Sequence, residues 1–127
     1  AAAQSVLSAA SASAPAVFCR STQQSFLRLM STPTVLRVYE AESLTNRDAL
    51  AVLDSLQTLR QVRVSDEPPG VFDQWRRLAT LDTPSPKVWM HAYFAAFAIT
   101  GSLRLATFDT GFRSYASRGL SLELIDS

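Results

Sequence analysis

One carboxylate is unusual because a basic segment surrounds it. Asp109 is the single acidic residue between Thr83 and Leu122. The cations of this segment are Lys87, Arg104, Arg113 and Arg118. Asp109 follows a predicted strand, Leu103–Thr107, by two residues, and a carboxylate just beyond the carboxyl end of a strand can help to hold a hard cation such as Mg²⁺. The same residue can instead form an Asx turn with Gly111 or cap a short helix at Phe112.

The single histidine of the chain, His91, lies one helical turn after Lys87. The two side chains can therefore share one face of a helix. An imidazole in this place can serve as a general base or as a metal ligand. A histidine among aromatic residues such as Trp89 and Tyr93 is more often a partly buried packing residue, and no acid stands three or four positions away from His91. Both interpretations remain open at this point.

Composition excludes several classes of protein. A chain of 127 residues, 47% hydrophobic and 18% charged, is long enough to bury a core of its own. One cysteine, Cys19, excludes a disulfide framework, and one cysteine with one histidine is too few for a zinc site. The longest mostly apolar stretch, Val88–Ile99, is shorter than the ~20 residues of a membrane-spanning helix. We expect a soluble protein, and the absence of an initial Met suggests a piece of a longer sequence.

Apolar spacing predicts that strands and helices alternate along the chain. Strands are predicted at Ala16–Cys19, Val62–Val64, Leu103–Thr107 and Leu120–Ile125. One helix is predicted to end near Ala10, and a second to run from a capping box at Ser21–Gln24 to Pro33, followed by a loop at Thr34–Ser43. A second capping signature at Leu44–Asp48 precedes a helix that includes Leu50–Leu59, and further helices include Val71–Leu78 and Lys87–Thr100. Phe26, Leu27, Leu29 and Met30 are expected to face inward. The alternation favours an α/β sandwich with a central, largely parallel sheet flanked by helices.

Five separated segments carry a resemblance to a known family. They are Val17–Leu29, Glu67–Pro69, Ser85–Ala98, Leu103–Phe112 and Gly119–Leu124. In their order and spacing these segments resemble the VapC-type toxins of the PIN-domain family, over nearly the whole chain from about Ala16. The resemblance implies a single PIN-like α/β domain over residues 1–127, whose first strand is expected to lie upstream of Ala1.

The resemblance also implies an activity and its residues. Such proteins are metal-dependent endoribonucleases, hydrolases of phosphodiester bonds, in which Asp and Glu side chains hold Mg²⁺ or Mn²⁺. It implies a cytoplasmic protein without a membrane partner, an RNA substrate, a cognate antitoxin protein as inhibitor, and a homodimer. Asp109 matches a family carboxylate, so it is expected to be catalytic and a metal ligand, with His91 as a second catalytic residue. The two side chains are expected to approach each other at the carboxyl end of the sheet. Lys87, Thr107 and Arg113 are expected to bind the substrate.

The chain departs from the family pattern at its acidic positions. His91 stands where the family has an aspartate, the helix after Ser21 contains no acid, and the aspartate of the first strand is expected upstream of Ala1. One matching carboxylate is a poor Mg²⁺ site, so we expect weak metal binding and impaired cleavage. The alternative is a non-catalytic PIN-fold binding module that retains antitoxin or dimer contacts.

Overall fold

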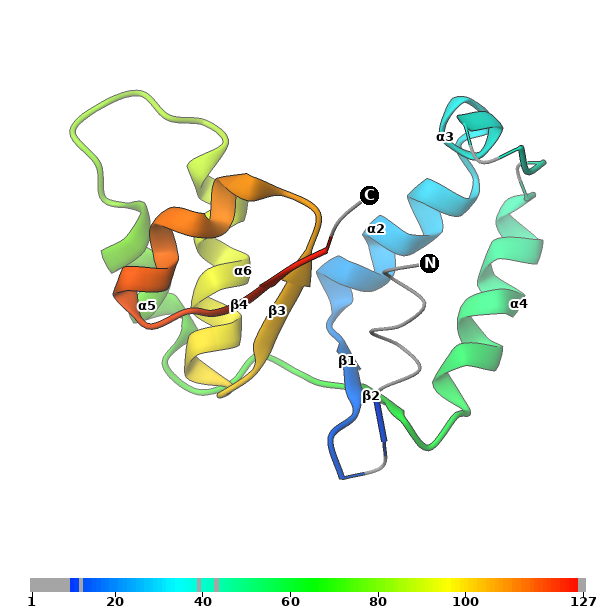
Figure 1. Ribbon diagram of the computed structural model, residues 1–127, viewed down its shortest axis with the longest axis horizontal. Coiled ribbons are helices and arrows are strands. Elements are labelled where there is room, and N and C mark those ends of the chain that lie inside the picture. Colours follow the sequence, from blue (N-terminus) through cyan, green and yellow to red (C-terminus); the bar gives the residue numbers. More distant parts are fainter. Residues whose placement is uncertain (1–9, 12, 39, 43, 126–127) are drawn as a thin grey trace. The chain divides into compact units, whose positions relative to one another are not determined.

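The computed structural model describes residues 10–11, 13–38, 40–42 and 44–125 (Figure 1). These residues divide into two compact units, one that ends at Asp66 and one that begins at Glu67. The helix predicted to end near Ala10 lies almost wholly outside the described residues, and the single domain over residues 1–127 stays a prediction. Within the described ranges, no helix is both long enough and apolar enough to cross a bilayer.

The unit that ends at Asp66 is a strand–helix–strand arrangement. Its elements are β1 (Ala16–Phe18), α2 (Arg20–Met30), α3 (Pro33–Val38), α4 (Asn46–Gln57) and β2 (Val62–Val64). β1 and β2 pair in parallel with Ala16 opposite Val62, so the three helices form the connection that a parallel pair requires. The backbone N–H of Ser65 extends this pairing by donating to the carbonyl of Phe18 at 2.8 Å.

The helix after β1 begins two residues earlier than its predicted capping box. Cys19 is the N-cap, and its backbone N–H donates to the side chain of Thr22 at 2.8 Å. One turn inside the helix, Gln23 is only 6% exposed, and its Nε2 donates to Oε1 of Gln57 at 2.6 Å. This bond between the buried Gln23 and the half-buried Gln57 joins α2 to α4. The box predicted at Ser21–Gln24 is therefore wrong in register but right about the helix.

Two further predictions for this unit need correction. The loop expected from Thr34 contains α3, because proline suits the first position of a helix and the buried Leu36 anchors that short helix. Leu29, expected to face inward, is 50% exposed because Gln23 occupies the buried face of α2. The start of α4 is confirmed, since the side chain of its N-cap Thr45 accepts from the backbone N–H of Asp48.

The unit that begins at Glu67 contains the candidate chemistry. Its elements are α5 (Val71–Ala79), α6 (Val88–Thr100), β3 (Arg104–Thr107), the 3₁₀-helix η1 (Thr110–Arg118) and β4 (Ser121–Leu124). β3 and β4 lie side by side in Figure 1 and pair in parallel, with Arg104 opposite Ser121. The α/β class and the parallel strand direction are thus confirmed. The nine-residue η1 was predicted as a turn followed by an unassigned segment.

Each unit contains one parallel strand pair, β1 with β2 and β3 with β4. A strand pair becomes part of a larger sheet only when another strand offers backbone donors and acceptors to its edge. That the four strands belong mostly to one sheet stays a prediction.

Helix α6 is the centre of the second unit. Its middle is built from small side chains that are almost completely buried, Ala92, Ala95, Ala96 and Ala98. Small residues let neighbouring elements approach closely, and α5 contributes Leu78 while η1 contributes Phe112 to the same core. A helix that is apolar on all sides must be covered on all sides. The first turn of α6 is the exception, since Trp89 and Met90 remain exposed and His91 is partly so.

We expect Leu78→Ala to lower the free energy of unfolding by about 2–5 kcal/mol, because Leu78 is the largest side chain that is fully buried among the described residues, at 1% exposure. Urea denaturation followed by circular dichroism measures the change. Leu50→Ala is the matched control, since Leu50 is 49% exposed and its truncation should cost about 1 kcal/mol or less. Equal losses for the two variants would contradict the core described here.

Candidate functional site

The carboxyl end of β3 leads directly into the candidate site. Asp109 is the N-cap of η1, and its Oδ1 accepts the backbone N–H of Gly111 at 2.8 Å. The backbone N–H of Asp109 donates to Oγ1 of Thr107 at 3.1 Å. Asp109 therefore has the capping role that its sequence context allowed, and its second carboxylate oxygen faces away from this cap. η1 ends at Gly119, whose backbone is in the left-handed conformation. A glycine at this place was the signal in the sequence for a helix after the predicted turn.

The first turn of α6 brings the single histidine to this carboxylate. Nε2 of His91 lies 3.1 Å from Oδ2 of Asp109, so the predicted approach of the two side chains is confirmed. The imidazole also packs on Phe112, with 4.6 Å between the ring centroids. Its side chain is 26% exposed and that of Asp109 is 51% exposed. His91 is thus a packing residue on one side and an accessible partner of a carboxylate on the other.

Gly111 makes room for this contact and was missed as a site residue. A Cβ atom on Gly111 would lie 3.0 Å from Oδ1 of Asp109 and 3.2 Å from Cε1 of His91. Both distances are shorter than ordinary carbon contacts, so a larger residue would displace one of the two side chains. The signal in the sequence was the spacing of Asp109 and Gly111, because a glycine often follows an Asx-type cap.

The other three predicted site residues differ in their relation to the pair. Lys87 is exposed at the start of α6, and its positive charge acts on Asp109. Thr107 is half-buried and fixes the backbone of Asp109 through its hydroxyl. Arg113 is exposed on η1 and takes part in none of the contacts that join Asp109 to His91. The substrate-binding roles of all three stay predictions.

The surroundings of Asp109 favour its charged form. The backbone N–H of Gly111 is the largest cause that lowers the pKa of Asp109 below its ordinary value of 3.8, and partial desolvation opposes it. The imidazole of His91, through charge and hydrogen bond, and the charge of Lys87 lower the pKa further. At neutral pH the site therefore presents a carboxylate within a basic segment.

The donor set does not fit Mg²⁺ by itself. Mg²⁺ takes six oxygen ligands in near-octahedral geometry. Here Oδ1 of Asp109 is engaged by Gly111 and Oδ2 by His91. Among the described residues, no three side chains of His, Cys, Asp or Glu lie close enough to share a metal ion. One carboxylate with one imidazole is a donor set that suits Mn²⁺ or a later transition metal better than Mg²⁺.

We expect His91→Gln to raise the pKa of Asp109 without restoring it to 3.8, because the variant removes the imidazole but keeps the dominant bond from Gly111. Carboxyl NMR signals followed through an acid titration measure the value. Since the folded-state pKa is lowered, Asp109 stabilises the fold above its ordinary pKa, and this contribution disappears as the pH falls through the lowered value. An unchanged pKa in the variant would show that the imidazole does not act on Asp109.

Known proteins resemble this chain over most of its length. No protein-family model matches it. Two curated proteins are similar to it, both named Ribonuclease VapC41, from Mycobacterium tuberculosis strains CDC 1551 / Oshkosh and ATCC 25618 / H37Rv. Each is 49% identical over 109 residues, which cover 85% of this chain and 73% of the relative. The short parallel strands and surrounding helices agree with the fold expected of that family. The chain belongs to the VapC family of PIN-domain proteins.

Proposed function

We propose that this protein is an RNA-cleaving hydrolase, an endoribonuclease of the toxin–antitoxin type that acts in the cytoplasm. The observation that carries the proposal is the pair of Asp109 and His91 at the carboxyl end of β3, in a chain that is 49% identical to proteins named ribonucleases. The carboxyl ends of parallel strands are where α/β proteins bind their ligands. The pair is accessible there, and a basic segment surrounds it.

Each residue of the site has a role in this proposal. Asp109 accepts a hydrogen bond from Nε2 of His91 and so fixes the orientation of the imidazole. The other ring nitrogen is then available to exchange a proton with a water or a hydroxyl at the scissile phosphate. Lys87 and Arg113 supply positive charge to the phosphates of the RNA. Thr107 holds Asp109 in place through the bond to its backbone.

Metal dependence is part of the proposal, with Asp109 as the ligand. The described residues near Asp109 offer one carboxylate rather than a cluster and do not fit Mg²⁺ by themselves, so we expect Mg²⁺ or Mn²⁺ to bind weakly. A bound divalent cation would neutralise charge on the phosphodiester. Weak binding implies impaired cleavage in Mg²⁺.

The family also suggests the partners. We propose that a cognate antitoxin protein inhibits this chain, that the chain forms a homodimer, and that single-stranded RNA is its substrate. The exposed site supports the last of these, since the half-exposed Asp109 is open to a ligand as extended as an RNA strand.

One observation favours a second candidate function. Both oxygens of Asp109 have partners inside the protein, Gly111 and His91, and these contacts alone explain why the residue is there. A PIN-fold module that retains antitoxin or dimer contacts without cleaving RNA would keep such a structural cap. The two candidates differ in whether the charge of Asp109 is needed for RNA cleavage.

We expect His91→Asp to raise cleavage of a mixed-sequence RNA in Mg²⁺ about tenfold or more, because a second carboxylate beside Asp109 adds an oxygen ligand and the gain in metal binding outweighs the loss of proton exchange by the imidazole. Adding Asp109→Asn to either form should reduce the rate to background, since the amide keeps the shape of the cap but loses the charge. Gel analysis of labelled RNA, with and without a chelator, measures the rates.

Two results would count against this proposal. If His91→Asp leaves cleavage at background in Mg²⁺ and in Mn²⁺, the non-catalytic binding module is the better account. The unaltered chain could instead cleave RNA in Mg²⁺ as fast as His91→Asp does, with Asp109→Asn abolishing the cleavage. The expectation of impaired activity would then be wrong, and the site would contain more metal ligands than Asp109 and His91. Arg104→Gln is the matched charge control, because Arg104 pairs with Glu123 on β4 rather than with the site.

A further inference from the structure

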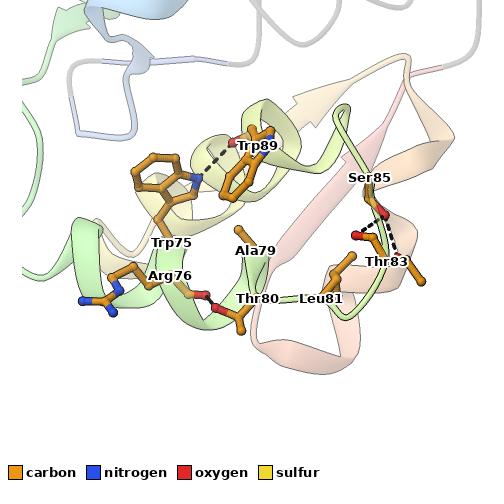
Figure 2. A pocket seen from close by; sticks show the side chains of 8 residues that line it. All are labelled: Trp75, Arg76, Ala79, Thr80, Leu81, Thr83, Ser85 and Trp89. Atoms are coloured by element: carbon orange, nitrogen blue, oxygen red, sulfur yellow. Dashed lines mark hydrogen bonds between the residues drawn. The ribbon is translucent and has the colours of Figure 1, made fainter.

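A pocket lies on the same unit as Asp109 and His91 but is lined by neither of them. This pocket of about 330 Å³ is formed by the end of α5, the start of α6 and the segment between them (Figure 2). Its side chains combine two indoles, one cation and three hydroxyls: Trp75, Trp89, Arg76, Thr80, Thr83 and Ser85. Pockets that combine aromatic walls with a few polar groups are typical sites for small planar ligands.

The two indoles are held in fixed positions. Nε1 of Trp75 donates to the backbone carbonyl of Trp89 at 2.9 Å, and the ring centroids are 6.2 Å apart at an angle of 70°. Trp75 packs further against Tyr93, with its ring nearly perpendicular. Trp89 is nevertheless 58% exposed. An exposed indole whose backbone is fixed in this way offers an aromatic surface at little cost in conformational entropy.

The polar groups of the pocket suit a ligand with hydrogen-bonding atoms. Arg76 is among the lining residues, but its guanidinium lies over the Phe72 ring, 5.5 Å from the ring centre, and points away from Thr83 and Ser85 (Figure 2). The hydroxyls of Thr83 and Ser85 lie 2.9 Å apart and can exchange that bond for bonds to a ligand (Figure 2). No carboxylate is among the residues that line the pocket.

We propose that this pocket binds a nucleobase of single-stranded RNA, with Trp89 as the stacking surface and the hydroxyls of Thr83 and Ser85 as hydrogen-bonding groups. The inference rests on the proposed ribonuclease function. Aromatic surfaces with nearby cations are the common way in which proteins bind unpaired bases. A protein partner would be expected to bury a broad apolar area, whereas this pocket is small and three of its eight lining residues carry hydroxyls.

Tryptophan fluorescence reports on this pocket directly, because the chain contains two tryptophans and both line it. We expect a single-stranded RNA oligonucleotide to quench the fluorescence on binding. An abasic oligonucleotide of the same length, with the same number of phosphates, should bind more weakly and leave the fluorescence nearly unchanged. Chelator in the buffer keeps the RNA intact during the titration.

A pair of variants tests the stacking surface. Trp89→Leu should weaken binding of the RNA about fivefold or more, because it removes the aromatic surface but keeps apolar bulk. Trp89→Phe should restore most of the affinity. Since Trp89 is largely exposed, neither variant threatens the core, and circular dichroism confirms that each is folded.

The outcomes separate the pocket from the ribonuclease site. The base-binding proposal is overturned if Trp89→Leu binds the RNA as tightly as the unaltered chain, or if the abasic oligonucleotide quenches the fluorescence equally. Either result stands even if cleavage that depends on Asp109 persists. Quenching and loss of affinity in Trp89→Leu support the pocket, even if no cleavage occurs. A change of oligomeric state in Trp89→Leu with unchanged RNA affinity would assign the pocket to a second protein chain and also overturn the proposal.

Discussion

A single carboxylate links the three elements on which the site depends. Asp109 ends the segment after β3, starts η1 by accepting the N–H of Gly111, and contacts His91 at the start of α6. Gly111 leaves room for both contacts, because a Cβ there would lie 3.0 Å from Oδ1 of Asp109 and 3.2 Å from Cε1 of His91 and would crowd both side chains. The local cap and the candidate chemistry are therefore the same interaction, and a change that loosens one also loosens the other.

The packing of α6 explains why this contact is at the surface. The alanines in the middle of the helix are buried, whereas the exposed side chains of α6 lie in its first turn, between Lys87 and the half-buried His91. The core thereby fixes the imidazole beside Asp109 and keeps one side of it open. Asp109 is negatively charged at neutral pH because its pKa is lowered, and by itself it would repel an anionic substrate. Four cations against this one acid give the segment from Thr83 to Leu122 a net positive charge, which favours binding of an anion.

Sequence reasoning predicted the elements that local physics determines. The cap at Thr45 and the apolar helix from Val88 followed from side-chain chemistry and spacing, and the approach of His91 to Asp109 followed from helix periodicity and strand position. It failed where a tertiary contact decided the outcome. The inner face of α2 contains the buried Gln23 and leaves Leu29 exposed, and a short helix with the buried Leu36 lies where a loop was expected.

The single histidine makes the central claim directly measurable. In proton NMR spectra the imidazole signals of this chain come from His91 alone, so no assignment among histidines is needed. If the contact of His91 with Asp109 is where RNA is bound and cut, a metal-free RNA oligonucleotide should shift these signals in the unaltered chain. Signals that stay unchanged while backbone amide shifts show RNA bound elsewhere on the protein would contradict this account.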